Sequence, residues 1–150
     1  MTEEISKFIA WNPKFELGIP VIDEQHKHLV ALCNDLYQQL ISNRQNISKE
    51  WQESFRSALK ECANYVVTHF RDEETLMKAS NYQRYKEHKN AHDIFTKKVL
   101  SSVASFENST MSDAIQFVHF LYDWILSHIA MEDKMFAKPV LEYFVKNGNI

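Results

Sequence analysis

Histidine is the residue type in this chain whose spacing points most directly to chemistry. The 150-residue sequence contains 7 His. His69 precedes Glu73 by four residues and His88 precedes His92 by four, so each pair shares one face of a helix. His26 and His128 also fall in phase with apolar neighbours. The remaining two, His28 and His119, lie about 200° and 180° around their helices from His26 and His128, and we expect them at the surface.

A shared metal site is the interpretation we prefer for these five inward-facing imidazoles. A single His on an apolar face is more often a hydrogen-bonded core residue than a ligand. Five imidazoles and a carboxylate buried without partners, however, would cost several kcal/mol per group. Imidazole with carboxylate suits iron, zinc or copper better than magnesium or calcium. Five His exceed the needs of one tetrahedral zinc. The pattern therefore predicts two metal ions with carboxylates between them.

The elements that must position these ligands are helices. The chain has only 2 Gly and 3 Pro, and residues 21–138 contain neither. This excludes Gly-rich phosphate loops, dinucleotide-binding folds and chains of tight β-hairpins. Apolar residues recur at helical spacing in four segments. Those segments are residues 22–42, 48–78, 82–107 and 112–132.

Short connections between these segments predict an all-α fold, an up-down-up-down antiparallel four-helix bundle. We expect one domain over residues 1–150, with an extended N-terminal arm at about 1–21 and the bundle at about 22–133. Residues 134–145 are a candidate short C-terminal helix. Apolar stripe positions in the third and fourth helices include Val103 and Ile115.

The predicted helix ends rely on polar residues in place of Gly. Asp23 and Ser48 are candidate N-caps, and Thr110-x-x-Asp113 resembles a capping box. Asn tolerates the left-handed conformation, so the Asn residues in the breaks, such as Asn81 and Asn108, are expected to end helices.

Charge and cysteine content exclude other classes. The formal net charge is −3 with no basic block, so neither nucleic acid nor an anionic membrane is an expected partner. Cys33 and Cys62 are too few for a disulfide scaffold, and we interpret both as buried packing residues. The N-terminus lacks an apolar signal core and no apolar run reaches membrane length, which predicts a cytoplasmic location.

Four motifs in this chain resemble those of hemerythrins, especially the bacterial ones. They are the run from Gly18 to Lys27 with His26, the HxxxE of His69 and Glu73, the HxxxH of His88 and His92, and the HxxxxD of His128 and Asp133. The resemblance covers about residues 11–135. It implies two iron ions, one bound by His26 and His69 and the other by the remaining three His. Glu73 and Asp133 would bridge them, together with a hydroxide or oxide.

Helical periodicity and the family resemblance predict different residues for one of the metal ligands. Glu132 follows His128 by four residues, about 40° around an α-helix, whereas Asp133 follows by five, about 140° away. Helical spacing favours Glu132 and the motif favours Asp133. We follow the motif, which requires the helix to end or to be distorted at this point.

The implied function is reversible binding of O2 for oxygen storage, delivery (oxygen transport) or sensing. Two His on one iron against three on the other would leave one open position for O2. Candidate wall residues of this O2 pocket are Trp124, Ile125, Phe70, Leu29 and Met77.

A binding protein is preferred to an enzyme because ferritin-like di-iron oxidases use mostly carboxylates with Glu-x-x-His. Alternatives left open are a di-iron oxidase, peroxidase or nitric oxide reductase, and a stand-alone sensory module. The oligomeric state is also open, with a monomer as one option.

Overall fold

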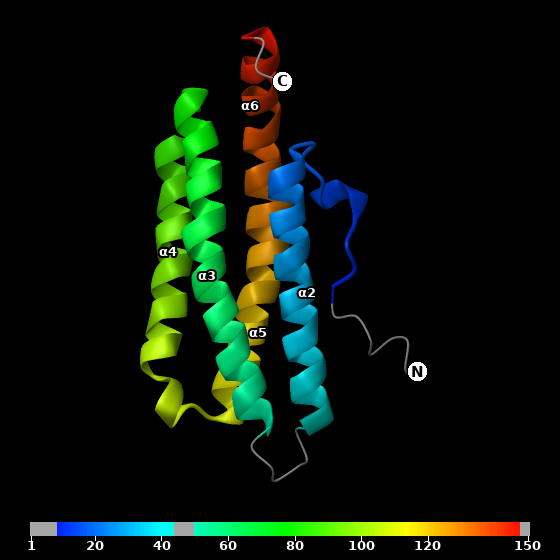
Figure 1. The fold of residues 1–150 in the computed structure, drawn as a ribbon, viewed down its shortest axis with the longest axis vertical. Helices are drawn as coiled ribbons and strands as arrows, with labels where there is room; N and C mark the ends of the chain where they lie inside the picture. Colours follow the sequence, from blue (N-terminus) through cyan, green and yellow to red (C-terminus); the bar gives the residue numbers. More distant parts are fainter. Residues whose placement is uncertain (1–8, 44–49, 148–150) are drawn as a thin grey trace.

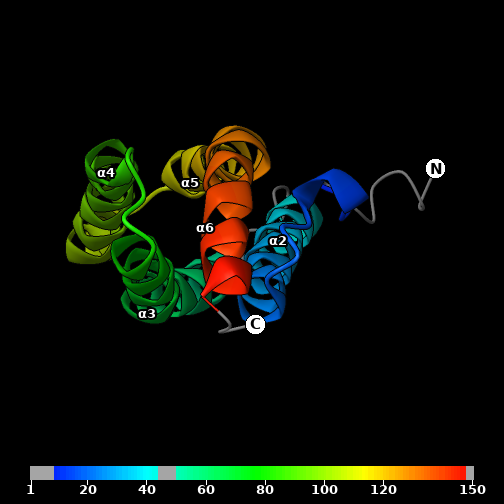
Figure 2. The same ribbon diagram turned by 90° about the horizontal axis from the view of Figure 1, so that it is seen from above.

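The computed structural model describes residues 9–43 and 50–147, and the regular structure in these ranges is entirely helical. The long helices run side by side along the long axis of the molecule (Figure 1). Seen from above, α2, α3, α4 and α5 surround a common centre (Figure 2). The predicted all-α bundle is confirmed. The helices are α2 Pro20–Asn43, α3 Glu50–Ala79, α4 Tyr85–Ala104, α5 Met111–Trp124, the π-helix η3 Ile125–Asp133 and α6 Lys134–Lys146.

The part of the N-terminal arm that the structure describes packs along α2, as expected (Figure 1). The backbone N–H of Ile9 donates to Asn34 Oδ1 at 2.7 Å, and Asn34 Nδ2 donates back to the Ile9 carbonyl at 2.7 Å. A 3₁₀ turn, η1 Pro13–Phe15, then buries Phe15 against the ring of Trp11. Residues 1–8 of the predicted arm lie outside the described residues.

The predicted N-cap role of Asp23 is wrong. Helix α2 begins at Pro20, whose fixed φ and missing N–H suit a first helical position. Asp23 lies inside the first turn, and its carboxylate accepts the backbone N–H groups of Leu17 at 2.8 Å and Gly18 at 3.1 Å. The side chain therefore fixes the arm onto the start of α2. Ser48, the other predicted N-cap, lies outside the described residues.

The turn between α3 and α4 depends on Asn81, which has φ 54°. The N–H of Tyr82 donates to the carbonyl of Met77, and that of Asn81 to Lys78. These two bonds are the helix-ending pattern usually built on Gly, so the prediction for Asn81 is confirmed.

The third helix, α4, is shorter than the predicted 82–107, because residues 82–84 form the turn after α3. At its other end η2 Phe106–Asn108 is a 3₁₀ turn. The left-handed conformation predicted for Asn108 is wrong. The capping box of Thr110 and Asp113 is present at the start of α5.

The fourth helix does not end at Asp133. Segments α5, η3 and α6 follow one another without a break from Met111 to Lys146, and Pro139 lies inside α6. The distortion expected at this point takes the form of the π-helix η3. No helix among the described residues is long and apolar enough to cross a membrane.

The buried apolar residues form two clusters. The larger one fills the bundle between α2, α3, α4 and α5, and the smaller joins α2, α3 and α6 around Ile22, Met77 and Phe136. Two predicted core positions are wrong: Val103 is 45% exposed and Ile115 is 40% exposed. Both lie near the end of the bundle where α4 gives way to α5, and their side chains face outward.

Candidate metal centre

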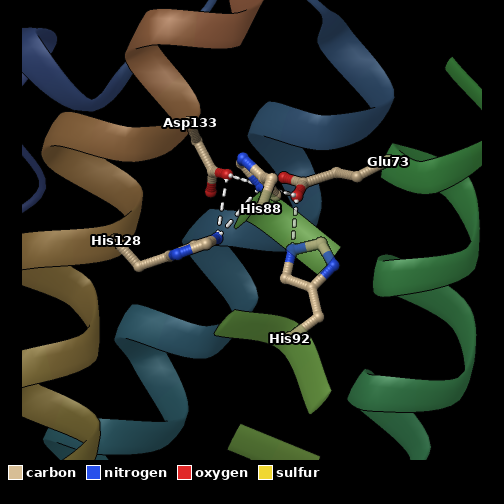
Figure 3. A group of neighbouring side chains, drawn as sticks. All are labelled: Glu73, His88, His92, His128 and Asp133. Atoms are coloured by element: carbon tan, nitrogen blue, oxygen red, sulfur yellow. Dashed lines mark hydrogen bonds and ion pairs between the residues drawn. The ribbon is translucent and has the colours of Figure 1, made fainter. Parts of the chain in front are cut away.

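Seven polar side chains are buried inside the bundle, and each has at most 4% of its surface exposed. They come from every long helix of the bundle, and Figure 3 shows five of them converging from α3, α4 and η3. These are all seven of the metal ligands predicted from sequence. They are His26 on α2, His69 and Glu73 on α3, His88 and His92 on α4, and His128 and Asp133 on η3.

Glu73 directs one carboxylate oxygen toward each of two groups of imidazoles. Its Oε2 lies 3.1 Å from His26 Nε2 and 3.0 Å from His69 Nε2. Its Oε1 lies 3.3 Å from His88 Nε2 and 3.1 Å from His92 Nε2. A carboxylate in this position can contact two metal ions at once, one through each oxygen.

Asp133 repeats this arrangement from the opposite side of the cluster (Figure 3). Its Oδ2 lies 3.0 Å from His26 Nε2. Its Oδ1 lies 2.8 Å from His88 Nε2 and 3.1 Å from His128 Nε2. Two groups of ligand atoms result, and they share both carboxylates. One contains His26 and His69, and the other contains His88, His92 and His128.

The distances fit coordination better than they fit hydrogen bonding. Ligand atoms about 2.1 Å from a metal, at right angles, lie about 3.0 Å from one another. The pairs of imidazole Nε2 atoms in His26 with His69 and in His88 with His128 are both 3.1 Å apart. Both Asp133 oxygens and His92 Nε2 have these short contacts but no well-directed hydrogen bond among the described residues. Atoms that approach closely without aiming at one another are those expected around metal ions.

The π-helix explains how Asp133 replaces Glu132. In η3 the backbone is wound so that residues five apart are stacked, the i→i+5 pattern of a π-helix. His128 and Asp133, five apart, then reach the same point, and Glu132 stays partly exposed. Periodicity of an ordinary α-helix cannot predict this register.

Hydrogen bonds one step from the ligands hold two of the imidazole rings. His69 Nδ1–H donates to Gln25 Oε1 at 2.6 Å, and Gln25 Nε2 donates to Asp72 Oδ2 at 2.7 Å. His92 Nδ1–H donates to Glu74 Oε2 at 2.9 Å. Each bond places the proton on Nδ1 and leaves Nε2 free to bind a metal. Sequence reasoning missed these partners, because nothing in the sequence separates them from other polar surface residues.

The charges in the cluster compensate one another. Burial alone would raise the pKa of Glu73 and of Asp133, but the surrounding imidazoles hold both pKa values below their usual range. Burial alone would lower the pKa of His26 and His88, yet the adjacent carboxylates of Asp133 and Glu73 raise each pKa to about 9. For His69, burial dominates and the pKa falls.

Aromatic rings cover the imidazoles on the side of the larger apolar cluster. Phe70 stacks on His92 with ring centres 3.8 Å apart, and Trp124 stacks on His128 at 3.9 Å. Both are among the wall residues predicted from sequence, and both stack on predicted ligands. Leu29 and Ile125 are buried in the same cluster, whereas Met77 belongs to the smaller one.

Tyr65 is a wall residue that the sequence analysis missed. Its ring stacks on His69 at 4.6 Å. It lies four residues before His69, on the same face of α3, and this spacing was the available signal. Burial raises the pKa of its hydroxyl well above the usual range, and the charges of Glu73 and Asp133 add to the rise. The nearby Trp124 N–H acts in the opposite direction, although the two groups are not aligned as a hydrogen bond.

Two surface grooves extend toward the cluster. One, of about 670 Å³, lies between α2 and α3 and includes Tyr65 and His69 in its lining. The other, of about 300 Å³, lies between α3 and α4 and includes Phe70 and His92. Each groove brings solvent to the edge of one group of ligands.

The two cysteines are free, buried thiols. Burial raises the pKa of Cys33 to about 12, and the pKa of Cys62 rises further, since Cys33 and Glu61 add to the effect of burial. Both thiols are therefore protonated at neutral pH, as expected of packing residues.

The sequence is similar to those of known proteins. Residues 17–139 match the family model for the hemerythrin HHE cation binding domain. The chain is 33% identical to a hemerythrin-like protein of Naegleria gruberi, over 89% of this chain and 94% of that protein. It is 29% identical to a bacteriohemerythrin of Clostridium acetobutylicum, over 83% of this chain and 95% of the relative. A bacteriohemerythrin of Stenotrophomonas maltophilia is 28% identical, with 88% and 81% covered.

The matched region runs from the end of the arm into α6 and contains all seven clustered side chains. By this match and by the Naegleria relative, the chain belongs to the hemerythrin family.

Proposed function

We propose that this protein binds O2 reversibly at a pair of iron ions inside the bundle. The observation that carries the proposal is the placement of Glu73 and Asp133, each with one oxygen toward the two-His group and one toward the three-His group. Imidazole with carboxylate is a donor set that suits iron. The relatives named bacteriohemerythrin support the same choice.

The assignment of residues follows the two groups. His26 and His69 would hold one iron, and His88, His92 and His128 the other, with Glu73 and Asp133 shared. The first group offers four ligand atoms and the second offers five. With a solvent-derived hydroxide or oxide also shared, the position left open would belong to the two-His iron. Iron at this position would supply the electrons and the vacant site that O2 binding needs.

The protein's own residues would make binding reversible. Glu73 and Asp133 neutralise positive charge in a buried site, where uncompensated charge is costly. Gln25 and Glu74 fix the imidazole orientation through His69 and His92. Phe70 and Trp124 cover the cluster with hydrocarbon and limit access of water and protons.

Anaerobic loading with Fe(II), followed by air and then removal of O2, tests the proposal. We expect two irons per chain and a visible absorption band that appears with O2 and disappears when O2 is removed. A stable oxidised form with release of peroxide would contradict O2 carriage and favour the enzymatic alternative.

Matched variants test the ligand assignment. His26→Ala should lose iron, whereas His28→Ala, two residues away on the exposed face of α2, should keep both irons. His128→Ala should lose iron from the three-His group. If His128→Ala keeps two irons per chain, the assignment of that group is wrong.

A further inference from the structure

Two buried hydrogen-bond donors near the cluster have no partner among the described residues. They are the hydroxyl of Tyr65 and the indole N–H of Trp124. Tyr65 is 6% exposed and Trp124 is 9% exposed. Native proteins rarely leave buried donors unpaired, and such a group calls for a bound water or ligand as its acceptor. Their position therefore identifies where an acceptor is needed.

The surroundings of these donors are hydrocarbon on one side. Phe70 lies 5.8 Å from the ring of Tyr65 and 5.8 Å from that of Trp124, measured between ring centres. The ring centre of Phe95 lies 6.3 Å from that of Tyr65 and 4.5 Å from that of Trp124. Neither phenylalanine can accept a conventional hydrogen bond. The acceptor must come from another direction.

The other side of the donors is the metal-binding cluster. Tyr65 stacks on His69, which belongs to the two-His group, and Trp124 stacks on His128, which belongs to the three-His group. The hydroxyl is close enough to Glu73 and Asp133 to be influenced by both charges, and close to the indole N–H as well. The two donors thus lie at the boundary between the aromatic wall and the two ligand groups.

We propose that the Tyr65 hydroxyl and the Trp124 indole N–H together bind the outer atom of a small, electron-rich ligand held at the metal pair. The ligand class is a diatomic or triatomic species with an acceptor at its free end, such as O2 or a small linear anion. Tyr65 and Trp124 then determine its affinity and orientation. This inference rests on the metal pair of the proposed function.

The groove between α2 and α3 reaches the residues beside this position. It measures about 670 Å³, and Tyr65 and His69 both contribute to its lining. Tyr65 therefore borders both this groove and the cluster residue His69.

Stability of the metal-free protein distinguishes ligand binding from a structural role. Tyr65→Phe removes a hydroxyl that has no partner in the absence of ligand, so its Tm should equal or exceed that of the unaltered chain. A hydroxyl that stabilises the fold would give a lower Tm instead. Tyr82→Phe, which alters a half-buried ring on the side of the smaller apolar cluster, is the matched control.

Azide affinity of the oxidised, iron-loaded protein is the deciding measurement. Azide is a linear anion with an acceptor at its outer end. Loss of one hydrogen bond to a charged ligand should weaken its binding about tenfold in Tyr65→Phe, with no change in Tyr82→Phe. Iron content is measured on the same samples, so failure to load iron, which would contradict the proposed function, is recognised separately.

Infrared spectroscopy of bound azide provides a second readout. A hydrogen bond at the outer nitrogen should make its stretching band shift in D2O for the unaltered protein, and the shift should shrink in Tyr65→Phe. An unchanged azide constant and an unchanged isotope shift in an iron-loaded Tyr65→Phe protein would overturn the inference. If the Tyr65→Phe variant does not retain iron, azide affinity and the isotope shift are measured on Trp124→Phe instead, and unchanged values there would overturn the inference.

Discussion

At the scale of single residues, the ligands depend on the polar groups that hold them. His69 can present Nε2 to a metal because its Nδ1–H is bound by Gln25, which is itself bound to Asp72. Such outer partners fix the tautomer and the ring orientation. They lie on α2 and α3, so each also links two helices across the site.

Removal of the Gln25 side chain should therefore weaken metal binding without unfolding the protein. We expect Gln25→Ala to lower the affinity of the two-His group for metal by about tenfold or more. Competition with a chelator measures the affinity. Gln83→Ala, in the exposed turn before α4, is the control. Equal affinities for both variants would show that Gln25 has no role in the site.

At the scale of elements, the π-helix η3 selects the carboxylate that joins the site. Its winding aligns Asp133 with His128 and directs Glu132 away. A π-helix is less favourable than an α-helix and occurs mostly at functional sites. Here it places the Asp133 carboxylate beside His88 and His128.

Neighbouring carboxyl variants test this register. Asp133→Asn should lower the metal content of the protein, because one of the two shared carboxylates is lost. Glu132→Gln, one residue away, should bind as much metal as the unaltered protein. Metal analysis after loading and desalting compares the two. The reverse result would mean that the segment follows ordinary α-helical spacing in solution.

The turn at Asn81 gives a second prediction at this scale. Its φ of 54° is tolerated by Asn and free of strain for Gly, whereas Ala pays about 1–2 kcal/mol. Asn81→Ala should therefore destabilise the protein by about 1 kcal/mol or more, and Asn81→Gly should not. Denaturant unfolding measures both. Equal loss in the two variants would point to the Asn side chain instead of the backbone.

At the scale of the whole molecule, the polar cluster lies between two apolar clusters. The larger fills the bundle between α2, α3, α4 and α5, and the smaller joins α2, α3 and α6. Burial of seven polar side chains in this position is costly without a metal. Stability of the whole fold is therefore linked to what the cluster binds.

Metal-free protein should lose stability as pH rises from 6.5 to 9. The folded-state pKa of His26 and of His88 is about 9, against an ordinary value of 6.5. A His whose pKa is raised by folding stabilises the folded state fully below pH 6.5. This contribution to the free energy of unfolding, on the order of a few kcal/mol, is lost as pH rises through 9.

Metal-loaded protein should change little over this range, because its imidazoles have already released their protons. Thermal unfolding of both forms between pH 6.5 and 9 checks the difference. If the Tm of both forms changes equally with pH, stability of the fold is not linked to metal binding at the cluster.

The helical class, the inward-facing set of five His with Glu73, and most helix boundaries could be predicted from the sequence. These follow from local rules: apolar periodicity, i,i+4 spacing, and the absence of Gly and Pro from residues 21–138. Identification of Asp133 already needed the family motif, because α-helical spacing favours Glu132. Asp23 and the exposed Val103 were misassigned because local pattern does not reveal what packs nearby.

The position of each carboxylate oxygen relative to the two groups of imidazoles could be seen only in the folded structure. The position of Glu73 and Asp133 between the two groups of imidazoles depends on the placement of each carboxylate oxygen between helices that are far apart in the sequence. The same holds for Gln25, and for the unpaired donors of Tyr65 and Trp124, which become visible when partners can be counted in space. A sequence specifies which groups are available, whereas directed contacts at about 3 Å arise from the packing of whole helices.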